Sequence, residues 1–265
     1  MDGFCVIRGL LDGFDDPGPT PGHWSEADRD TPLDIALMLV AASLGRVFGW
    51  TGQQDGRIVH NILPAKGYEH LQVGASSTTP LYWHTEDAFH PHRADLLLLA
   101  CVRNHENLGS RVSSIRRATL TDAQIATLSQ PGLTILPDDS YPSRPRGEVH
   151  PMATLWPASD GLCVRYDPSY TRMLTDDPDF EAAYAALDPA LEKCAVTVPM
   201  RAGDIALIDN DVAVHGRAAF EPRFDGTDRW LKRILIHLDR PRPPAELTED
   251  GYGEALIETE AGRTA

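Results

Sequence analysis

Two histidines and a glutamate stand out as groups that could bind a metal ion. His84 and Glu86 lie two residues apart in the stretch WHTED, and His215 lies far along the chain in DNDVAVHGR. Residues two apart in a β-strand point to the same face, so His84 and Glu86 should converge. Joined by His215, they would form the two-histidine, one-carboxylate set that binds non-haem iron(II) and leaves positions open for dioxygen and a cosubstrate.

Other interpretations of these three residues have to be weighed. A single histidine is more often hydrogen-bonded or exposed to solvent than bound to a metal, and the His-x-Glu spacing alone is a weak motif. Two histidines and a glutamate are also a catalytic zinc set, so a zinc-dependent hydrolase is an alternative. Against it, the sequence lacks the His-Glu-x-x-His spacing of zinc peptidases.

Two arginines follow the distal histidine. Arg229 and Arg233 lie in the run DRWLKRILIHLD, which could be a helix or a strand. A hairpin loop after His215 could bring a guanidinium back beside the metal strand. There it could hold the distal carboxylate of 2-oxoglutarate through two parallel hydrogen bonds. Taken alone, the two arginines would pass for exposed charges, but the three candidate ligands favour the anion-binding interpretation.

The composition limits the classes of partner. The 265 residues carry a formal net charge of -15. Phosphate binding needs a basic face, so nucleic acid and anionic membranes are disfavoured, and a cationic small molecule is favoured. The four cysteines are far apart, and the longest apolar run, IALMLVAA, is too short to cross a bilayer. We expect a cytoplasmic protein; the oligomeric state is not indicated.

Helix and strand signals predict a mainly β protein with a few helices. Thr31 and Pro32 mark the start of a helix, and Thr121 and Gln124 form a capping box that starts another. A helix in DPDFEAAYAALDPALEKC should break or kink at Pro189. Strands that suit a two-sheet core are expected in GFCVIRGL, RIVHNILP, ADLLLLACVR and RAGDIALIDN.

Two long blocks of the sequence resemble the clavaminate synthase-like group of iron(II)/2-oxoglutarate oxygenases. They are WHTEDAFHPHRADLLLLACVRN and PMRAGDIALIDNDVAVHGRAAFEPRFDGTDRWLKR. Within the group, the chain is most similar to hydroxylases of free basic amino acids such as arginine and lysine, from about Gly3 to Pro243. The resemblance implies a double-stranded β-helix, a jelly roll flanked by helices. Because the chain starts almost on its first strand, we expect a shortened N-terminal region.

The resemblance implies roles for the candidate residues. His84, Glu86 and His215 would be the iron(II) ligands, and Arg229 would bind 2-oxoglutarate. With O2, such an enzyme hydroxylates an unactivated carbon while 2-oxoglutarate is decarboxylated to succinate and CO2. A jelly-roll protein that binds a small acid or cation without catalysis is a further alternative.

The resemblance also implies how a free basic amino acid would bind. Arg233 would contact its α-carboxylate, Gln53 and the second oxygen of Glu86 its α-amino group, and Asp167 the cationic end of its side chain. C3 would then lie nearest the iron, with C4 as the alternative. Ser169 stands where arginine hydroxylases of the family carry a second acid. Lysine, ornithine and a cyclic arginine derivative are therefore open beside arginine, since a guanidinium prefers paired acidic partners.

The domain organisation is predicted from composition. We expect a single oxygenase domain over residues 1–243. Its proline-rich stretch predicts a lid loop over about 137–168, because long loops in compact domains often serve as lids. Residues 244–265 turn acidic and polar, which predicts a C-terminal tail.

Overall fold

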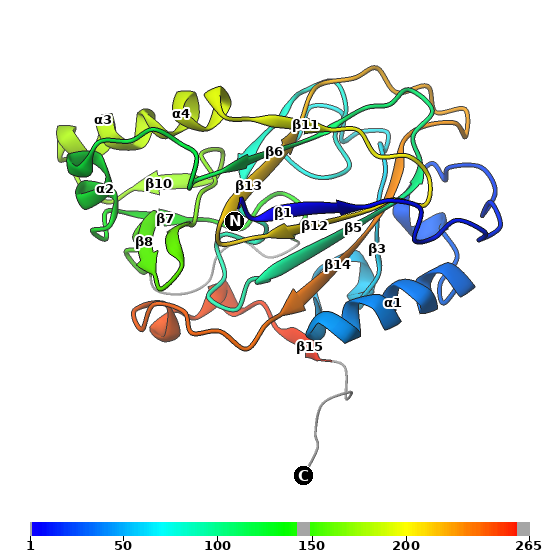
Figure 1. Ribbon diagram of the computed structural model, residues 1–265, viewed down its shortest axis with the longest axis horizontal. Coiled ribbons are helices and arrows are strands. Elements are labelled where there is room, and N and C mark those ends of the chain that lie inside the picture. Colours follow the sequence, from blue (N-terminus) through cyan, green and yellow to red (C-terminus); the bar gives the residue numbers. More distant parts are fainter. Residues whose placement is uncertain (1, 142–148, 259–265) are drawn as a thin grey trace, which may run out of the picture.

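Two antiparallel sheets form the body of the protein in a computed structural model that describes residues 2–141 and 149–258 (Figure 1). The larger sheet contains, in spatial order, β1 (Phe4–Ile7), β12 (Ile205–Asp209), β5 (Leu96–Arg103), β14 (Trp230–His237), β2 (Arg46–Trp50) and β15 (Leu256–Glu258), with β3 (His60–Ile62) beside β14. The smaller sheet contains β11 (Val196–Val198), β6 (Ser110–Ser114), β13 (Ala213–Arg217) and β4 (Leu81–His84). The predicted mainly β jelly roll is confirmed.

The strand β5 shows how the sequence sets up two apolar layers. Leu97 and Leu99 belong to the core cluster shared with the smaller sheet, whereas Leu98 and Ala100 belong to a second cluster. Side chains alternate between the two faces of a strand, so a continuous apolar run suits a strand buried on both sides. The helix α1 (Pro32–Leu44) packs on β14 and β2 and covers the second face (Figure 1).

The helix starts are where the sequence predicts them. Capping boxes begin α1 at Thr31 and α2 (Asp122–Leu128) at Thr121. The helix around Pro189 divides into α3 (Pro178–Ala185) and α4 (Leu187–Lys193). The division falls at Ala186, ahead of Pro189, because a proline ring clashes with the carbonyl four residues earlier in a continuous helix. No helix among the described residues is long and apolar enough to cross a membrane.

Short elements complete the fold. Two small antiparallel pairs are β7 (Leu133–Ile135) with β10 (Thr171–Met173), and β8 (Leu155–Ala158) with β9 (Gly161–Val164). Single 3-10 turns are η1 (Trp24–Glu26), η2 (Gln54–Gly56), η3 (Glu246–Thr248) and η4 (Gly251–Gly253).

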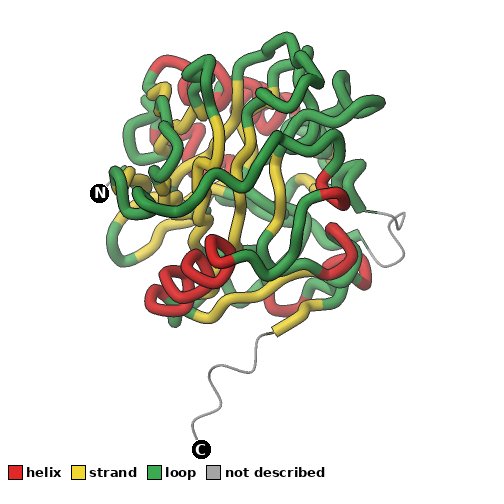
Figure 2. Tube along the Cα trace, turned by 90° about the vertical axis from the view of Figure 1, so that its right-hand side faces the viewer, coloured by secondary structure: helices red, strands yellow, loops and turns green. Residues whose placement is uncertain are grey.

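Two segments expected to lie outside the core are largely part of it. Within the expected lid over 137–168, residues 142–148 lie outside the described residues, but β8 and β9 form a hairpin with Leu155 and Val164 buried. The expected tail over 244–265 instead adds β15 to the edge of the larger sheet (Figures 1 and 2), and only 259–265 lie outside the described residues.

Ion pairs explain why the composition of the C-terminal segment was misleading. Glu246 accepts a hydrogen bond of 2.7 Å from the buried Arg93, and Glu249 pairs with the buried Arg165 at 2.8 Å. An acidic segment is expected to stay solvated only when its charges lack partners. Here the core supplies the partners, so the segment is packed.

A buried ion pair fastens α1 to the outer face of the larger sheet. Lys232 of β14 is 2% exposed, and its Nζ lies 2.7 Å from Oδ1 of Asp34 on α1. Lys232 also donates to Oδ1 of Asn61, at 3.2 Å. Because neighbouring residues of a strand face opposite ways, Lys232 points to α1 while Arg233 points between the sheets.

We predict that Asp34→Asn lowers the free energy of unfolding by about 3 kcal/mol, because Lys232 would keep a buried charge without its anionic partner. Urea denaturation at neutral pH measures the change. The matched control is Asp55→Asn, because the Asp55 side chain is exposed and its ion pair with Arg29 is long, at 3.8 Å. Equal stability of the two variants would contradict the prediction.

Candidate active site

A cavity of about 420 Å³ is lined by residues from both sheets. This volume suits a small-molecule site. All residues singled out from the sequence line it: His84, Glu86, His215, Arg229, Arg233, Gln53 and Asp167. The fold therefore brings these residues together in one cavity, although some of them lie more than one hundred positions apart in the sequence.

The two histidines face each other across two paired strands. His84 ends β4 and lies directly opposite His215 of β13, with ring centroids 4.1 Å apart. One ligand atom from each of His84, Glu86 and His215 lies within 4.8 Å of the other two. No other group of three or more histidine, cysteine and acidic residues in the described part of the chain is placed to hold a metal. The predicted metal-binding set is therefore assembled.

Glu86 reaches the site by a route that differs from the prediction. We expected it on the same strand as His84, but β4 ends at His84. Asn210, in the turn after β12, instead holds the Glu86 backbone: its Oδ1 accepts from the Glu86 N–H at 2.8 Å, and its Nδ2 donates to the Glu86 carbonyl at 3.0 Å. The only sequence signal for Asn210 was its place in the tight DND turn.

The protonation states suit a cation. The Nδ1 of His84 lies 2.9 Å from the Tyr82 carbonyl, so Nδ1 carries the proton and Nε2 is free to bind a metal. Burial and the neighbouring His215 lower the pKa of His84 to about 4, which leaves a neutral imidazole at neutral pH. Burial alone would raise the pKa of Glu86, but the Arg233 guanidinium outweighs it and keeps the carboxylate ionised. The nitrogen of a neutral imidazole and a carboxylate anion are donors that fit iron(II).

Gly216 allows the two histidine strands to approach. The pairing of β13 with β4 changes register between His215 and Arg217. A Cβ atom at Gly216 would lie 2.5 Å from the carbonyl oxygen of Leu81, a backbone atom. Arg217 then donates to the carbonyls of Ser76 and Ser77, at 2.9 and 3.1 Å, and so fixes the loop that leads into β4.

Arg229 is a buried cation without an acidic partner among the described residues. Its Nη2 donates to the Ser110 hydroxyl at 2.7 Å, and no carboxylate of the described residues pairs with it. Burial lowers its pKa to about 10, which still leaves it charged at neutral pH. A buried, unpaired guanidinium is costly, and a ligand carboxylate would relieve that cost.

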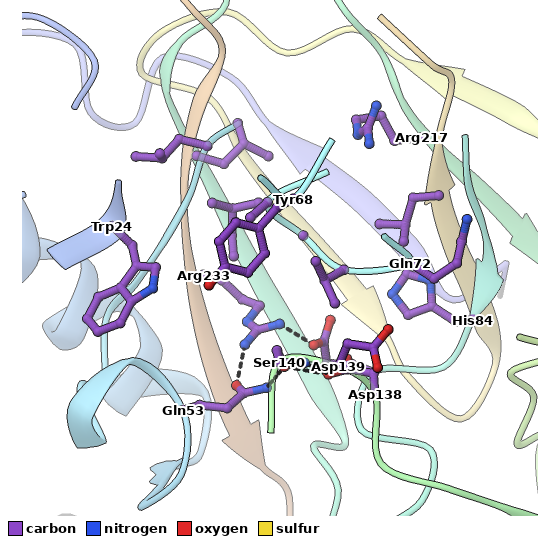
Figure 3. Close-up of a pocket in the computed structure, with 18 of the residues that line it drawn as sticks. Trp24, Gln53, Tyr68, Gln72, His84, Asp138, Asp139, Ser140, Arg217 and Arg233 are labelled. Carbon is purple, nitrogen blue, oxygen red and sulfur yellow. Dashed lines mark hydrogen bonds and ion pairs between the residues drawn. The ribbon is translucent and has the colours of Figure 1, made fainter. Parts of the chain in front are cut away.

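Arg233 bonds to three other side chains. Its Nη1 donates to Oε1 of Glu86, and its Nη2 donates to Oε1 of Gln53 at 2.6 Å (Figure 3). The Nη2 also lies 2.6 Å from Nδ1 of His60, a residue that the sequence did not single out. The two residues predicted to bind an α-amino group thus share one guanidinium in the ligand-free structure.

Two aspartates lie in the same cavity. Burial, helped by the charge of Asp138, raises the pKa of Asp167 to about 8. Burial raises the pKa of Asp138 to about 6 as well, although Ser140 hydrogen-bonds its carboxylate. Asp138 lies beside Ser140 and Gln53 in Figure 3 and was missed from the sequence, because it sits in the stretch interpreted as a lid. Neighbouring carboxylates that resist ionisation favour a cationic ligand.

The model of the taurine catabolism dioxygenase TauD, TfdA family matches residues 36–235. The chain belongs to this family. It is 36% identical to the L-ornithine/L-arginine 3-hydroxylase of Catenulispora acidiphila, over 88% of this chain and 76% of the relative.

Two solved structures of related oxygenases share the fold. The non-heme iron oxygenase OrfP, in complex with Fe, succinate and (3S)-hydroxy-L-Arg, matches with a TM-score of 0.79 and 36% identity, over 89% of this chain and 76% of OrfP. An asparagine oxygenase in complex with Fe(II), 3-hydroxyasparagine and succinate matches with a TM-score of 0.80 and 33% identity, over 89% of this chain and 74% of that protein.

The similarity to these oxygenases decides the class of chemistry. The chain is an iron(II)- and 2-oxoglutarate-dependent oxygenase of the amino acid hydroxylase family, as the resemblance implied. A zinc hydrolase and a non-catalytic binding protein, the alternatives left open by the sequence, are not supported.

We predict that Gly216→Ala weakens iron(II) binding at least about tenfold, because the added methyl group must push β4 away from β13 and separate the histidines. Anaerobic titration with iron(II) measures the affinity. Gly22→Ala is the matched control, since its Cβ would meet only the flexible Glu26 side chain, at 3.4 Å. Unchanged affinity in Gly216→Ala would show that the close approach is not needed.

Proposed function

We propose that this oxygenase hydroxylates C3 of a free basic L-amino acid, with arginine or ornithine as the first candidates and lysine or a cyclic arginine derivative as the next. The observation that carries the proposal is the pair of cavity carboxylates, Asp138 and Asp167. A neutral side chain such as that of asparagine would leave both acids without a cation. An ammonium or guanidinium would supply one.

The second acid bears on the choice of substrate. Ser169, at the position where a second acid was expected, donates its backbone N–H to Oδ1 of Asp167 at 3.0 Å. Asp138 follows β7 in the chain, lines the same cavity and provides a second carboxylate. A planar guanidinium can bind two carboxylates at once, so this arrangement supports arginine more strongly than the sequence alone did.

Another group of cavity residues suits an amino acid head group. We assign the α-carboxylate to Arg233 and the α-amino group to Gln53 and Glu86. A substrate held at both ends presents the carbons between them to the metal ligands, and its first side-chain carbon lies next to the head group. This placement favours C3 over C4, since positioning decides which C–H bond reacts.

The cosubstrate site is assigned to the other basic group. We assign Arg229 to the distal carboxylate of 2-oxoglutarate, and His84, Glu86 and His215 to iron(II). Bound iron(II) with 2-oxoglutarate and O2 supplies the oxidant for an unactivated C–H bond. The protein residues bind and orient the two organic acids, and the cavity restricts access of water.

We predict that arginine, ornithine or lysine gains one oxygen atom with an equal yield of succinate, whereas asparagine reacts poorly. The protein is incubated with iron(II), 2-oxoglutarate, air and a panel of L-amino acids, and products are identified by mass spectrometry. Fragmentation of the product locates the hydroxyl group. A clear preference for asparagine over every basic amino acid would overturn the proposal.

We predict that the preference for a cationic side chain rises between about pH 6 and pH 8.5. The pKa values near 6 and 8 leave Asp138 and Asp167 increasingly ionised over this range, and only the anions attract the substrate cation. The measured quantity is the kcat/KM for arginine divided by that for citrulline, its neutral analogue, so that other effects of pH cancel.

Matched variants test the assignment of this preference. In Asp167→Asn the arginine-to-citrulline ratio should fall at least about tenfold and lose most of its pH dependence, because a charged hydrogen bond is lost. Asp176→Asn is the control, because Asp176 is exposed and does not line the cavity. A ratio in Asp167→Asn that equals the control value would refute the assignment.

A further inference from the structure

His60 lies directly opposite Arg233 on paired strands. Residue His60 of β3 is in register with Arg233 of β14, and its side chain is 1% exposed. Its Nδ1 lies 2.6 Å from Nη2 of Arg233. A guanidinium has no lone pair to offer, so Nδ1 must accept the hydrogen bond and Nε2 must carry the ring proton.

The surroundings keep His60 in this neutral form. Burial, together with the charge of Arg233, lowers its pKa to about 3. The ring is therefore neutral at neutral pH, and it does not line the cavity where the substrate would bind. Its contribution has to be geometric.

The other ring nitrogen makes no side-chain contact that would explain why this residue is a histidine. Nε2 is buried and has no hydrogen-bond partner among the described residues. A buried donor without a partner is unfavourable, and an apolar side chain of similar size would avoid it. The bond to Arg233 is the one side-chain hydrogen bond of the ring in the described structure, and the backbone of Arg57 also lies close enough to raise the pKa of the ring.

We propose that His60 is a positioning residue that fixes the guanidinium of Arg233 for the α-carboxylate of the amino acid substrate. The inference rests on the proposed function, which assigns that carboxylate to Arg233. It adds a residue that neither touches the substrate nor binds the metal.

The hydrogen-bond pattern shows what this positioning achieves. Nη2 of Arg233 has two hydrogens, and the acceptors are Nδ1 of His60 and Oε1 of Gln53, each at 2.6 Å. Nη1 bonds to Glu86, and Nε has no partner in the described structure. An arriving carboxylate can bind the second Nη1 hydrogen, or it can displace Gln53 or Glu86, which line the cavity, rather than His60, which does not.

The hydrogen bond between His60 and Arg233 is the one that we expect to remain when the substrate carboxylate binds. His60 is buried and fixed by strand pairing, and its bond holds one side of the Arg233 guanidinium toward β3. A substrate carboxylate that displaces Gln53 and Glu86 would release both from the guanidinium. These are the groups assigned to the α-amino group, so both ends of the head group bind in one exchange.

Three substitutions of His60 distinguish the effect of losing the hydrogen-bond acceptor from the effect of losing the volume of the ring. In His60→Asn the side-chain oxygen lies where Nδ1 was and can accept from Arg233. In His60→Gln the oxygen lies farther out, near the former Nε2, and in His60→Leu there is no acceptor. Asn and Gln therefore form a matched pair of equal polarity, which keeps the test usable if the Leu variant does not fold.

We expect KM for the amino acid to rise on the order of tenfold in His60→Leu and His60→Gln, with KM for 2-oxoglutarate unchanged, since one hydrogen bond to a charged group is lost. His60→Asn should keep a KM close to that of the wild type. The amino acid amide, which lacks the α-carboxylate, provides a second readout. The ratio of KM for the amide to KM for the acid should fall in the Leu and Gln variants.

The outcomes that overturn the inference differ from those that overturn the proposed function. An active wild type with the same amino acid KM in the Gln, Leu and Asn variants refutes the role of His60 and leaves the function intact. A parallel rise of both KM values in all variants also refutes it, because it indicates general damage to the fold. A wild type that binds 2-oxoglutarate but converts no basic amino acid refutes the function, and the inference with it.

Discussion

The antiparallel pairing of β4 with β13 is the constraint on which the active site depends. It places His84 opposite His215, and Glu86 begins the turn that follows β4. Because side chains alternate along a strand, a slip of one residue would turn a histidine to the other face. Gly216, the turn at Asn210 and the loop held by Arg217 all act on this one pairing, and none of them needs to touch a ligand.

The second constraint is the charge balance of the cavity. Buried charges are tolerated when they are paired, and the ligand-free site pairs only some of them. Glu86 and Arg233 neutralise each other, whereas Arg229 has no acidic partner and Asp138 and Asp167 have no basic one in the described part of the chain. A dicarboxylate such as 2-oxoglutarate and an amino acid with a cationic side chain would supply the missing charges.

Features set by neighbouring residues could be predicted from the sequence, whereas features set by distant partners could not. The capping boxes at Thr31 and Thr121 involve residues three positions apart, and both are present. The expected C-terminal tail failed because the acidic residues Glu246 and Glu249 pair with arginines far away in the sequence. Asp138 and His60 escaped notice for the same reason, since their significance comes from partners on other strands and loops.

The sequence by itself determined the residue types that carry the chemistry, the strand and helix periodicities, and, through its long motifs, the family. The tertiary structure decided the geometry of the site. Only strand pairing could show that His60 faces Arg233, and only the folded loops could show that Asp138 joins Asp167. The physical reason is that hydrogen bonds, desolvation and Coulomb interactions act over a few ångströms in space, whereas the residues that make them are spread along the whole chain.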